Sequence, residues 1–309
     1  MEGPTMLRRT TLLTATLLAG ALAFTGCAAE DPLDANGGDS KAGDTIVIGS
    51  QDYYSNEIIA EVYAQALEAD GFSVEREFRI GQREVYLPEI EAGAIDLFPE
   101  YTGNLLQYWE PETQARTSGD VYDALTAATP KGLRVLKQSP ATDQDSYTVT
   151  QAFAGEWNLS TVEDLARVTV PLTLGGNSEA ETRPYGPAGL AKVYGIEGVT
   201  FTPIEDSGGP LTVKALQDDD IQLAIIYTAD PTLSENKLVS LEDTKGVFLA
   251  SHVVPLASDR VDAGAAAVID KVSAAMTPAD LLEMNARSVN EQLPAADIAR
   301  DWLAAKKLG

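Results

Sequence analysis

Ile95-Asp96-Leu97-Phe98-Pro99-Glu100-Tyr101-Thr102 is a short apolar run that ends in Tyr-Thr, and Ile221-Gln222-Leu223-Ala224-Ile225-Ile226-Tyr227-Thr228 ends in the same way. Each run follows a predicted helix and is read as a strand. In an open α/β sheet, ligands bind outside the carboxyl ends of the strands. Tyr101 and Tyr227 are therefore predicted to face one cleft from two lobes. A cleft lined by aromatic rings suits an apolar or cationic small molecule.

The sequence around the first run alternates strands and helices. The predicted order is a strand at 45–49, a helix at 55–70 capped by Ser55 or Asn56, a strand at 74–78, a helix at 84–92 interrupted at Pro88, and a strand at 95–98. This βαβαβ order implies parallel strands with right-handed crossovers.

The same alternation returns around the second run. A capping box from Ser160 to Glu163 is expected to open a helix. The elements predicted after it are a strand at 169–174, a helix at 187–194, a strand at 199–203, a helix at 210–217 and a strand at 222–227. Three helices, starting near Asp262, Pro278 and Pro294, are predicted for the tail. The fold class is therefore α/β with two lobes and a ligand cleft between them. Lobe 1 is predicted to hold residues 44–145 and 252–309, and lobe 2 residues 146–251.

The first 43 residues have the pattern of an export signal and a tether. Arg8 and Arg9 precede an apolar stretch at 10–24, which is too short for an ordinary membrane span. Gly26-Cys27 then resembles a bacterial lipoprotein cleavage site, with an ordinary secretory signal and a stray cysteine as the alternative. We expect a signal peptide at 1–26, a lipid on Cys27 and a flexible tether at 27–43. The mature protein would then lie at the extracytoplasmic face of the cell membrane.

The chain is strongly acidic, with a formal net charge of −25. Removal of residues 1–26, which carry Glu2, Arg8 and Arg9, would bring this to −26. Such a charge argues against nucleic acid and against anionic lipid surfaces as partners. It is typical of an exported protein with an acidic surface, and it is compatible with a small cationic ligand.

The residue types needed for most catalysis are scarce. Cys27 is the only cysteine and His252 the only histidine, so a multi-histidine metal site and an internal disulfide are excluded. The glycine-rich loops at Gly175-Gly176 and Gly208-Gly209 match no nucleotide fingerprint. No metal, no cofactor and no enzymatic activity are therefore expected.

Several motifs occur in an order that resembles a known family. They are Gly49-Ser50-Gln51-Asp52-Tyr53, the 95–103 stretch ending in Glu100-Tyr101-Thr102-Gly103, Asp145-Ser146-Tyr147, Glu179 with Arg183, and Tyr227-Thr228-Ala229-Asp230. They look like the substrate-binding proteins of osmoprotectant ABC transporters, which take up glycine betaine, choline and related quaternary amines. The resemblance runs from about Thr45 to the C-terminus.

The resemblance implies a type II periplasmic-binding-protein-like fold, a monomer, and an ABC permease in the membrane as partner. It also implies an aromatic cage around a trimethylammonium group, built by matching position from Tyr53, Tyr101, Tyr147 and Tyr227. A quaternary ammonium has no N–H to donate, so ring faces recognise it through cation–π contacts. Arg183 matches the residue expected to hold a ligand carboxylate, with a surface ion pair to Glu179 or Glu181 as the alternative.

Two positions depart from the family pattern. Gln51 stands where the family often has lysine, next to the expected carboxylate, and Ser251, beside His252, stands where a tyrosine is expected. Asn104 is polar and is expected near the ligand. Glycine betaine, choline, carnitine and less related ligands therefore stay open. The alternatives from other classes are an extracellular enzyme on the same scaffold, for which Glu100 and Asp230 are the available carboxylates, and a binding protein for an unrelated small molecule.

Overall fold

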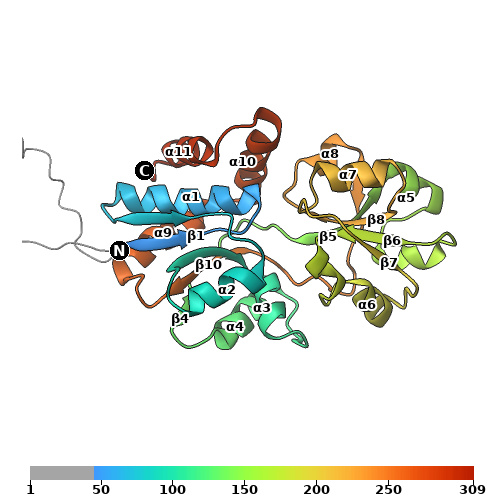
Figure 1. The fold of residues 1–309 in the computed structure, drawn as a ribbon, viewed down its shortest axis with the longest axis horizontal. Coiled ribbons are helices and arrows are strands. Elements are labelled where there is room, and N and C mark those ends of the chain that lie inside the picture. The colour runs from blue at the N-terminus through green and yellow to red at the C-terminus, as the bar shows by residue number, and fades with distance from the viewer. Residues whose placement is uncertain (1–44) are drawn as a thin grey trace, which may run out of the picture. The chain divides into compact units, whose positions relative to one another are not determined.

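The computed structural model describes residues 45–309, so the predicted signal peptide, the tether and Cys27 lie outside it. Within this range the chain forms two five-stranded sheets flanked by helices, which confirms the predicted two-lobed α/β class (Figure 1). The strand orders are β2-β1-β3-β10-β4 and β7-β6-β8-β5-β9. We call the first sheet with its helices lobe 1 and the second lobe 2.

Lobe 1 is built from two separate parts of the chain. Its first part comprises β1 (Ile46–Gly49), α1 (Tyr54–Ala69), β2 (Val74–Glu77), α2 (Arg83–Glu91), β3 (Leu97–Tyr101), α3 (Thr102–Trp109), α4 (Ser118–Ala128) and β4 (Leu133–Val135). Its second part comprises β10 (Val253–Ser258), α9 (Ala263–Ala275), α10 (Pro278–Glu291) and α11 (Ala295–Lys306).

Lobe 2 is formed by the intervening chain. Its strands are β5 (Asp145–Thr150), β6 (Thr173–Gly176), β7 (Thr200–Pro203), β8 (Leu223–Tyr227) and β9 (Leu238–Ser240). Its helices are α5 (Gln151–Trp157), α6 (Pro187–Gly189), α7 (Pro210–Gln217) and α8 (Thr232–Glu235), with the 3₁₀ helices η1 (Val162–Arg167) and η2 (Ser178–Glu181) and the π-helix η3 (Leu190–Tyr194).

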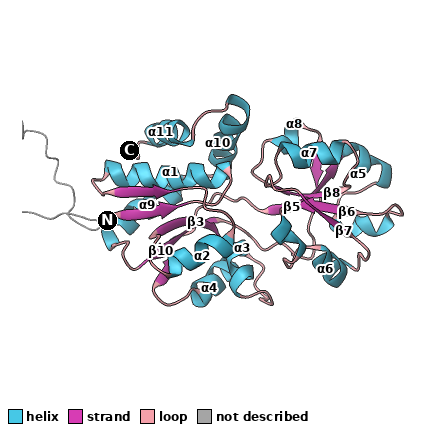
Figure 2. Cartoon of the chain, in the orientation of Figure 1, coloured by secondary structure: helices cyan, strands magenta, loops and turns pink. Residues whose placement is uncertain are grey.

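The two sheets have equivalent topologies. Each contains three parallel strands, β2-β1-β3 or β7-β6-β8, followed by an antiparallel strand, β10 or β5. β5 is the first strand that the chain forms after it passes from lobe 1 to lobe 2, and β10 is the first strand after it returns to lobe 1 (Figure 2). The chain therefore passes between the sheets in a first crossing segment, residues 136–144, and a second, residues 241–252. The predicted boundaries at 145 and 252 lie at these crossings, although the domain limits themselves stay predictions.

Helices bury apolar faces on both sides of the lobe 1 sheet. On one side α1 packs against α9, α10 and α11, and its residues Ile58, Ile59 and Val62 are fully buried. On the other side α2, α3 and α4 enclose a second cluster that contains Tyr86, Phe98 and Leu105. Burial of this kind contributes about 25 cal/mol per Å² of apolar surface, so the two layers hold the strand ends in place.

Some local predictions were wrong in detail. Tyr53, not Ser55 or Asn56, precedes the first turn of α1, and Asn56 lies inside the helix. α2 continues through Pro88, whose ring lies on an exposed face and removes only one helical hydrogen bond. The helix predicted at 187–194 divides into α6 and η3 and ends at Gly195, whose φ is 70°.

The predicted capping box at Ser160 is also displaced. The carboxylate of Asp164, not that of Glu163, accepts from the backbone N–H groups of Ser160 and Thr161 at 2.9 and 3.0 Å. Glu163 instead accepts a hydrogen bond from Thr244. The helix that follows is the short 3₁₀ helix η1.

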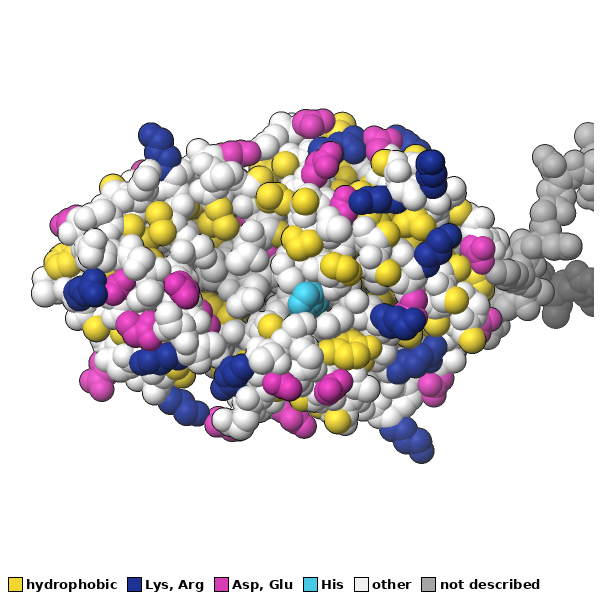
Figure 3. Space-filling model, turned by 180° about the vertical axis from the view of Figure 1, so that it is seen from behind, with side chains coloured by type: hydrophobic (Ala, Val, Ile, Leu, Met, Phe, Trp, Pro, Cys, Tyr) yellow, Lys and Arg dark blue, Asp and Glu magenta, His cyan; other side chains and the backbone are white. Residues whose placement is uncertain are grey.

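The surface of lobes 1 and 2 carries charges of both signs. Asp and Glu side chains are interspersed with Lys and Arg over the face seen in Figure 3. Across residues 45–309, no helix is long and apolar enough to cross a membrane.

Candidate ligand-binding site

A small pocket lies where the carboxyl ends of β1, β3 and β8 meet the first crossing segment. Its lining residues come from both lobes and from that segment: Gln51, Tyr53, Gln82, Arg83, Tyr101, Asn104, Asp143, Asp145, Glu179, Arg183, Tyr185 and Tyr227. Six of the seven predicted ligand-binding residues are among them. The exception is Tyr147.

Three of the predicted cage tyrosines face one another in this pocket. The ring of Tyr53 is stacked with that of Tyr101, with centroids 6.5 Å apart, and with that of Tyr227, at 5.3 Å. Tyr53 lies between β1 and α1, Tyr101 is the last residue of β3, and Tyr227 is the last residue of β8. Rings from lobe 1 and lobe 2 are thus in contact with each other.

The repeated Tyr-Thr pair has a structural explanation. Behind Tyr101, the backbone N–H of Thr102 donates to the carbonyl of His252 at 2.9 Å, and the hydroxyl of Thr102 accepts from the N–H of His252 at 3.0 Å. Behind Tyr227, Thr228 makes the same two bonds with Gln144, at 2.8 and 3.0 Å. In each pair the tyrosine lines the pocket and the threonine holds a crossing segment.

The loop that carries Gln51 and Tyr53 is held by a buried asparagine. The side chain of Asn56 accepts from the N–H of Gln51 at 2.8 Å and donates to the carbonyl of Pro99 at 2.9 Å. This links the end of β1 to β3. The side-chain nitrogen of Gln51 is buried, and among residues 45–309 it has no hydrogen-bond partner. It is therefore available to an oxygen atom of a ligand.

Asn104 joins three parts of the chain. Its amide nitrogen donates to the carboxylate of Asp145, and its amide oxygen accepts from the hydroxyl of Ser251 at 2.7 Å. Ser251, which stands where a tyrosine was expected, thus fixes the orientation of Asn104.

Tyr147 lies in the core of lobe 2 and does not line the pocket. It is fully buried, its ring is 4.6 Å from that of Phe248, and its hydroxyl donates to the carbonyl of Tyr185 at 2.5 Å. Tyr185 lines the pocket instead and also packs on Phe248, at 5.2 Å. Its position in the loop after η2 carried no strand-end signal, so the sequence analysis missed it.

Arg183 has a different partner from those predicted. Its guanidinium pairs with Glu84 of α2 at 2.8 Å, not with Glu179 or Glu181, and lies over the ring of Tyr108 at 5.4 Å. Because Glu84 belongs to lobe 1 and Arg183 to lobe 2, this ion pair connects the lobes. The predicted contact with a ligand carboxylate stays a prediction.

The two carboxylates considered for an enzyme both have structural partners. The carboxylate of Glu100 accepts hydrogen bonds from Arg83 at 3.0 and 2.7 Å, from the hydroxyl of Tyr86 at 2.5 Å and from the backbone N–H of Tyr101 at 2.9 Å. Asp230 accepts from the hydroxyl of Tyr54 and from the N–H of Thr232, both at 2.8 Å. The buried ion pair of Glu100 with Arg83 therefore holds the end of β3, and the hydrogen bond from Tyr54 to Asp230 holds the start of α1.

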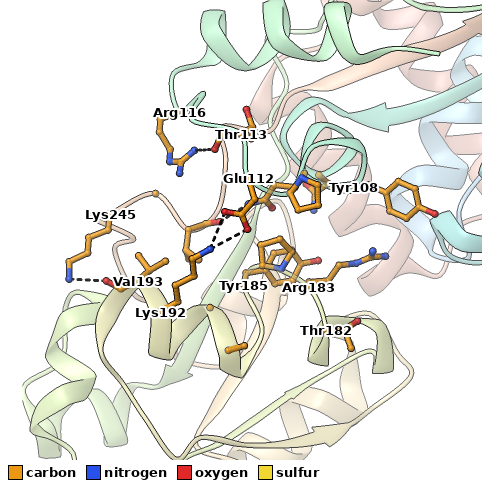
Figure 4. A pocket seen from close by; sticks show the side chains of 18 of the residues that line it. Tyr108, Glu112, Thr113, Arg116, Thr182, Arg183, Tyr185, Lys192, Val193 and Lys245 are labelled. Atoms are coloured by element: carbon orange, nitrogen blue, oxygen red, sulfur yellow. Dashed lines mark hydrogen bonds and ion pairs between the residues drawn. The ribbon is translucent and has the colours of Figure 1, made fainter. Parts of the chain in front are cut away.

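A wider groove of about 610 Å³ opens beside the pocket and shares Arg83, Asn104, Arg183 and Tyr185 with it. Figure 4 shows Lys192 of lobe 2 facing Glu112 of lobe 1 across this groove, with their charged atoms 3.1 Å apart. The groove therefore leads from the surface between the lobes to the tyrosines.

Comparison with known proteins identifies the family. Residues 44–305 match the family described as the substrate binding domain of ABC-type glycine betaine transport systems. The chain belongs to this family. It is 24% identical, over 86% of its length and 92% of the relative, to the glycine betaine-binding protein YehZ of Escherichia coli, and 28% identical, over 81% and 80%, to the carnitine transport binding protein OpuCC of Listeria monocytogenes.

A solved structure described as a glycine betaine/carnitine/choline ABC transporter has the same fold. It superposes with a TM-score of 0.67 at 20% identity, covering 85% of this chain and 99% of the other. Members of the family are extracytoplasmic binding proteins of importers rather than enzymes, so a small ligand and a membrane permease are the partners.

The tyrosine pocket is small in this structure. The space inside it is about 20 Å³, which is near the minimum for one water molecule. A trimethylammonium group is several times larger than a water molecule. A group of that size could bind between these rings only after the rings of lobe 1 and lobe 2 had separated, as in hinge closure around a bound molecule.

Proposed function

We propose that this chain captures a quaternary-ammonium compatible solute between Tyr53, Tyr101 and Tyr227 and delivers it to the permease of an ABC importer. The observation that carries the proposal is the stacking of rings from both lobes at 5.3 and 6.5 Å beside the hinge. A ligand that binds there contacts both lobes at once, so it stabilises the closed form that a permease can distinguish.

The energetics are adequate for a transport ligand. Each cation–π contact contributes roughly 0.5–2 kcal/mol, and micromolar binding needs about 8 kcal/mol. Three rings supply only part of this, and burial of the methyl groups supplies much of the rest. Tyr185 is the remaining ring in the lining, and we propose it as the fourth cage residue in place of Tyr147.

The relatives named above narrow the ligand class without choosing within it, since one is named for glycine betaine and the other for carnitine. We propose a monomer that is tethered by lipid on Cys27. Mass spectrometry of membrane-extracted protein tests the tether, because a diacylated N-terminal Cys27 is expected and an unmodified mature N-terminus elsewhere contradicts it.

A panel of methylamines tests the ligand class. The melting temperature of the purified mature chain is measured with choline, glycine betaine, carnitine, trimethylamine and ammonium chloride. A ligand present at 100 times its Kd stabilises the folded state by about 2.7 kcal/mol. At least one quaternary amine should raise the melting temperature, with ammonium chloride as the control for ionic strength. No shift with any quaternary amine would contradict the proposal.

A further inference from the structure

Asp143 is the one carboxylate of the pocket that belongs to a crossing segment and not to either lobe's sheet. Its side chain is 4% exposed and lines the pocket together with Tyr53, Tyr101 and Tyr227. One carboxylate oxygen, Oδ1, accepts from the N–H of Ala229 at 2.9 Å. Within residues 45–309 the other oxygen, Oδ2, accepts no hydrogen bond, and it is not fully enclosed.

The register of the sheets explains why this carboxylate is beside the rings. Asp145, the first residue of β5, pairs directly with Tyr227 of β8. The residues just before Asp145 therefore pass the carboxyl end of β8, where Tyr227 and Ala229 lie. Thr228 holds this segment through Gln144, so the position of Asp143 is fixed on both sides.

We propose that Asp143 is the counterion of the bound ammonium group and makes the pocket select cations over ligands that carry their own carboxylate. This inference rests on the proposed function, which it extends by naming the residue that reads the ligand's charge. A buried charge is costly unless another charge offsets it, and a cation held by the rings would offset the charge of the Asp143 carboxylate through Coulomb attraction. A zwitterion brings a second carboxylate into a pocket that already holds Asp143, Asp145 and Glu179.

The other charged groups near Asp143 strengthen this preference. Two carboxylates, Asp145 of β5 and Asp230 after β8, raise the pKa of Asp143 electrostatically. Asp143 in turn raises the pKa of four nearby tyrosines: Tyr53 and Tyr54 at the start of α1, Tyr101 of β3 and Tyr227 of β8. All of these are acids. The arginines of the pocket, Arg83 and Arg183, are paired with Glu100 and Glu84.

Proton release on binding is a consequence of this placement. Burial, together with Asp145 and Asp230, raises the pKa of Asp143 from 3.8 to about 8. In this closed arrangement the carboxyl therefore holds a proton below about pH 8. A cation beside Oδ2 favours the ionised form, so its binding lowers this pKa and the proton passes to the buffer. Affinity for a cation should then be greatest above pH 8 and should fall as the pH drops through 8, by up to about tenfold per unit.

Calorimetry of the mature chain with choline and with glycine betaine, in phosphate and in HEPES at pH 7 and at pH 8.5, tests the inference. The dependence of the heat on the buffer counts the protons released. We expect close to one proton per choline at pH 7 and clearly fewer per betaine. Asp143→Asn keeps an oxygen to accept from Ala229, and at pH 8.5 it should weaken choline by about tenfold or more while affecting betaine by less than about threefold.

Asp218→Asn is the matched control, because it removes a surface carboxylate that pairs with Lys214 and neither lines the pocket nor acts on Asp143. It should leave both the proton release and the preference for choline in place. Binding of choline without proton release at pH 7, or equal losses of choline and betaine in Asp143→Asn, overturns the inference and leaves the proposed function standing. Binding of no quaternary amine at either pH overturns both. The proton count in the unmodified chain decides the matter even if Asp143→Asn does not fold.

Discussion

Tyr101 and Tyr227 occupy the same place in two different sheets. Each is the last residue of the third parallel strand of its sheet, and the ring of each is stacked with the ring of Tyr53. This arrangement could be predicted from the sequence because both tyrosines directly follow an apolar strand, where side chains point into a cleft. Tyr147 does not follow this pattern, because it lies two residues inside β5 and packs in the core of lobe 2. A residue inside a strand lacks the positional signal that a strand end carries.

Replacing the rings should separate the aromatic face from the hydroxyl. Tyr101→Phe should bind a trimethylammonium ligand with little loss, because the face remains. Tyr101→Ala and Tyr227→Ala should each cost about 1–2 kcal/mol of binding free energy, or tenfold and more in Kd. Calorimetry measures this, with Tyr122→Ala in α4 as the control for loss of a ring far from the pocket. Unchanged affinity in both pocket variants, with folding intact, would remove the cage.

At the scale of secondary structure, the elements with clear periodicity or capping were predictable. β1, α1, β2, β3, α7 and the three C-terminal helices were confirmed to within a few residues. The elements missed were β4, β5, β9 and β10 with the short helices α3, α4, α5 and α8. β5 and β10 pair antiparallel with strands far away in sequence, as Val253 of β10 does with Tyr101 of β3. No local pattern specifies such a pairing.

The hydrogen bonds of Thr102 and Thr228 to the crossing segments should stabilise the fold by different amounts. The hydroxyl of Thr102 is buried, so Thr102→Val leaves the N–H of His252 without its acceptor and should lower the free energy of unfolding by about 1–3 kcal/mol. Thr228→Val should cost less, because its bond to Gln144 is exposed. Thr126→Val, on the surface of α4, is the control. The free energy of unfolding is measured by urea denaturation. If Thr102→Val lowers it no more than Thr126→Val does, the hydrogen bond between Thr102 and His252 does not stabilise the second crossing segment.

At the scale of the molecule, contacts between the lobes surround the pocket. Arg183 pairs with Glu84, Lys192 with Glu112 and Tyr54 with Asp230, each joining lobe 1 to lobe 2. None of these pairs was predicted, because each depends on the angle between lobes that are independent in sequence. The positions of Tyr101 and Tyr227 therefore followed from strand ends, while the contacts between the lobes came only from the structure.

Mutation can distinguish the ion pair of Arg183 with Glu84 from the proposed contact of Arg183 with a ligand carboxylate. Glu84→Gln removes its partner without touching a ligand, so choline and glycine betaine should lose affinity equally, by a few fold. Arg183→Ala should weaken the betaine further, because a charge-assisted hydrogen bond to a carboxylate contributes about 1.5–3 kcal/mol.

Lys192→Gln is the control for breaking an exposed pair between the lobes, and such pairs contribute about 0–1 kcal/mol. If Arg183→Ala weakens choline and betaine by the same factor, Arg183 stabilises closure and reads no carboxylate.

The central claim is that a quaternary ammonium group binds between rings supplied by both lobes. A crystal structure of the mature chain grown with saturating choline tests this most directly. We expect a trimethylammonium group enclosed by Tyr53, Tyr101 and Tyr227, within about 6 Å of their ring centroids, with Asp143 beside it. Choline bound in the outer groove near Lys192 and Glu112, with the three rings still stacked on one another, would contradict it.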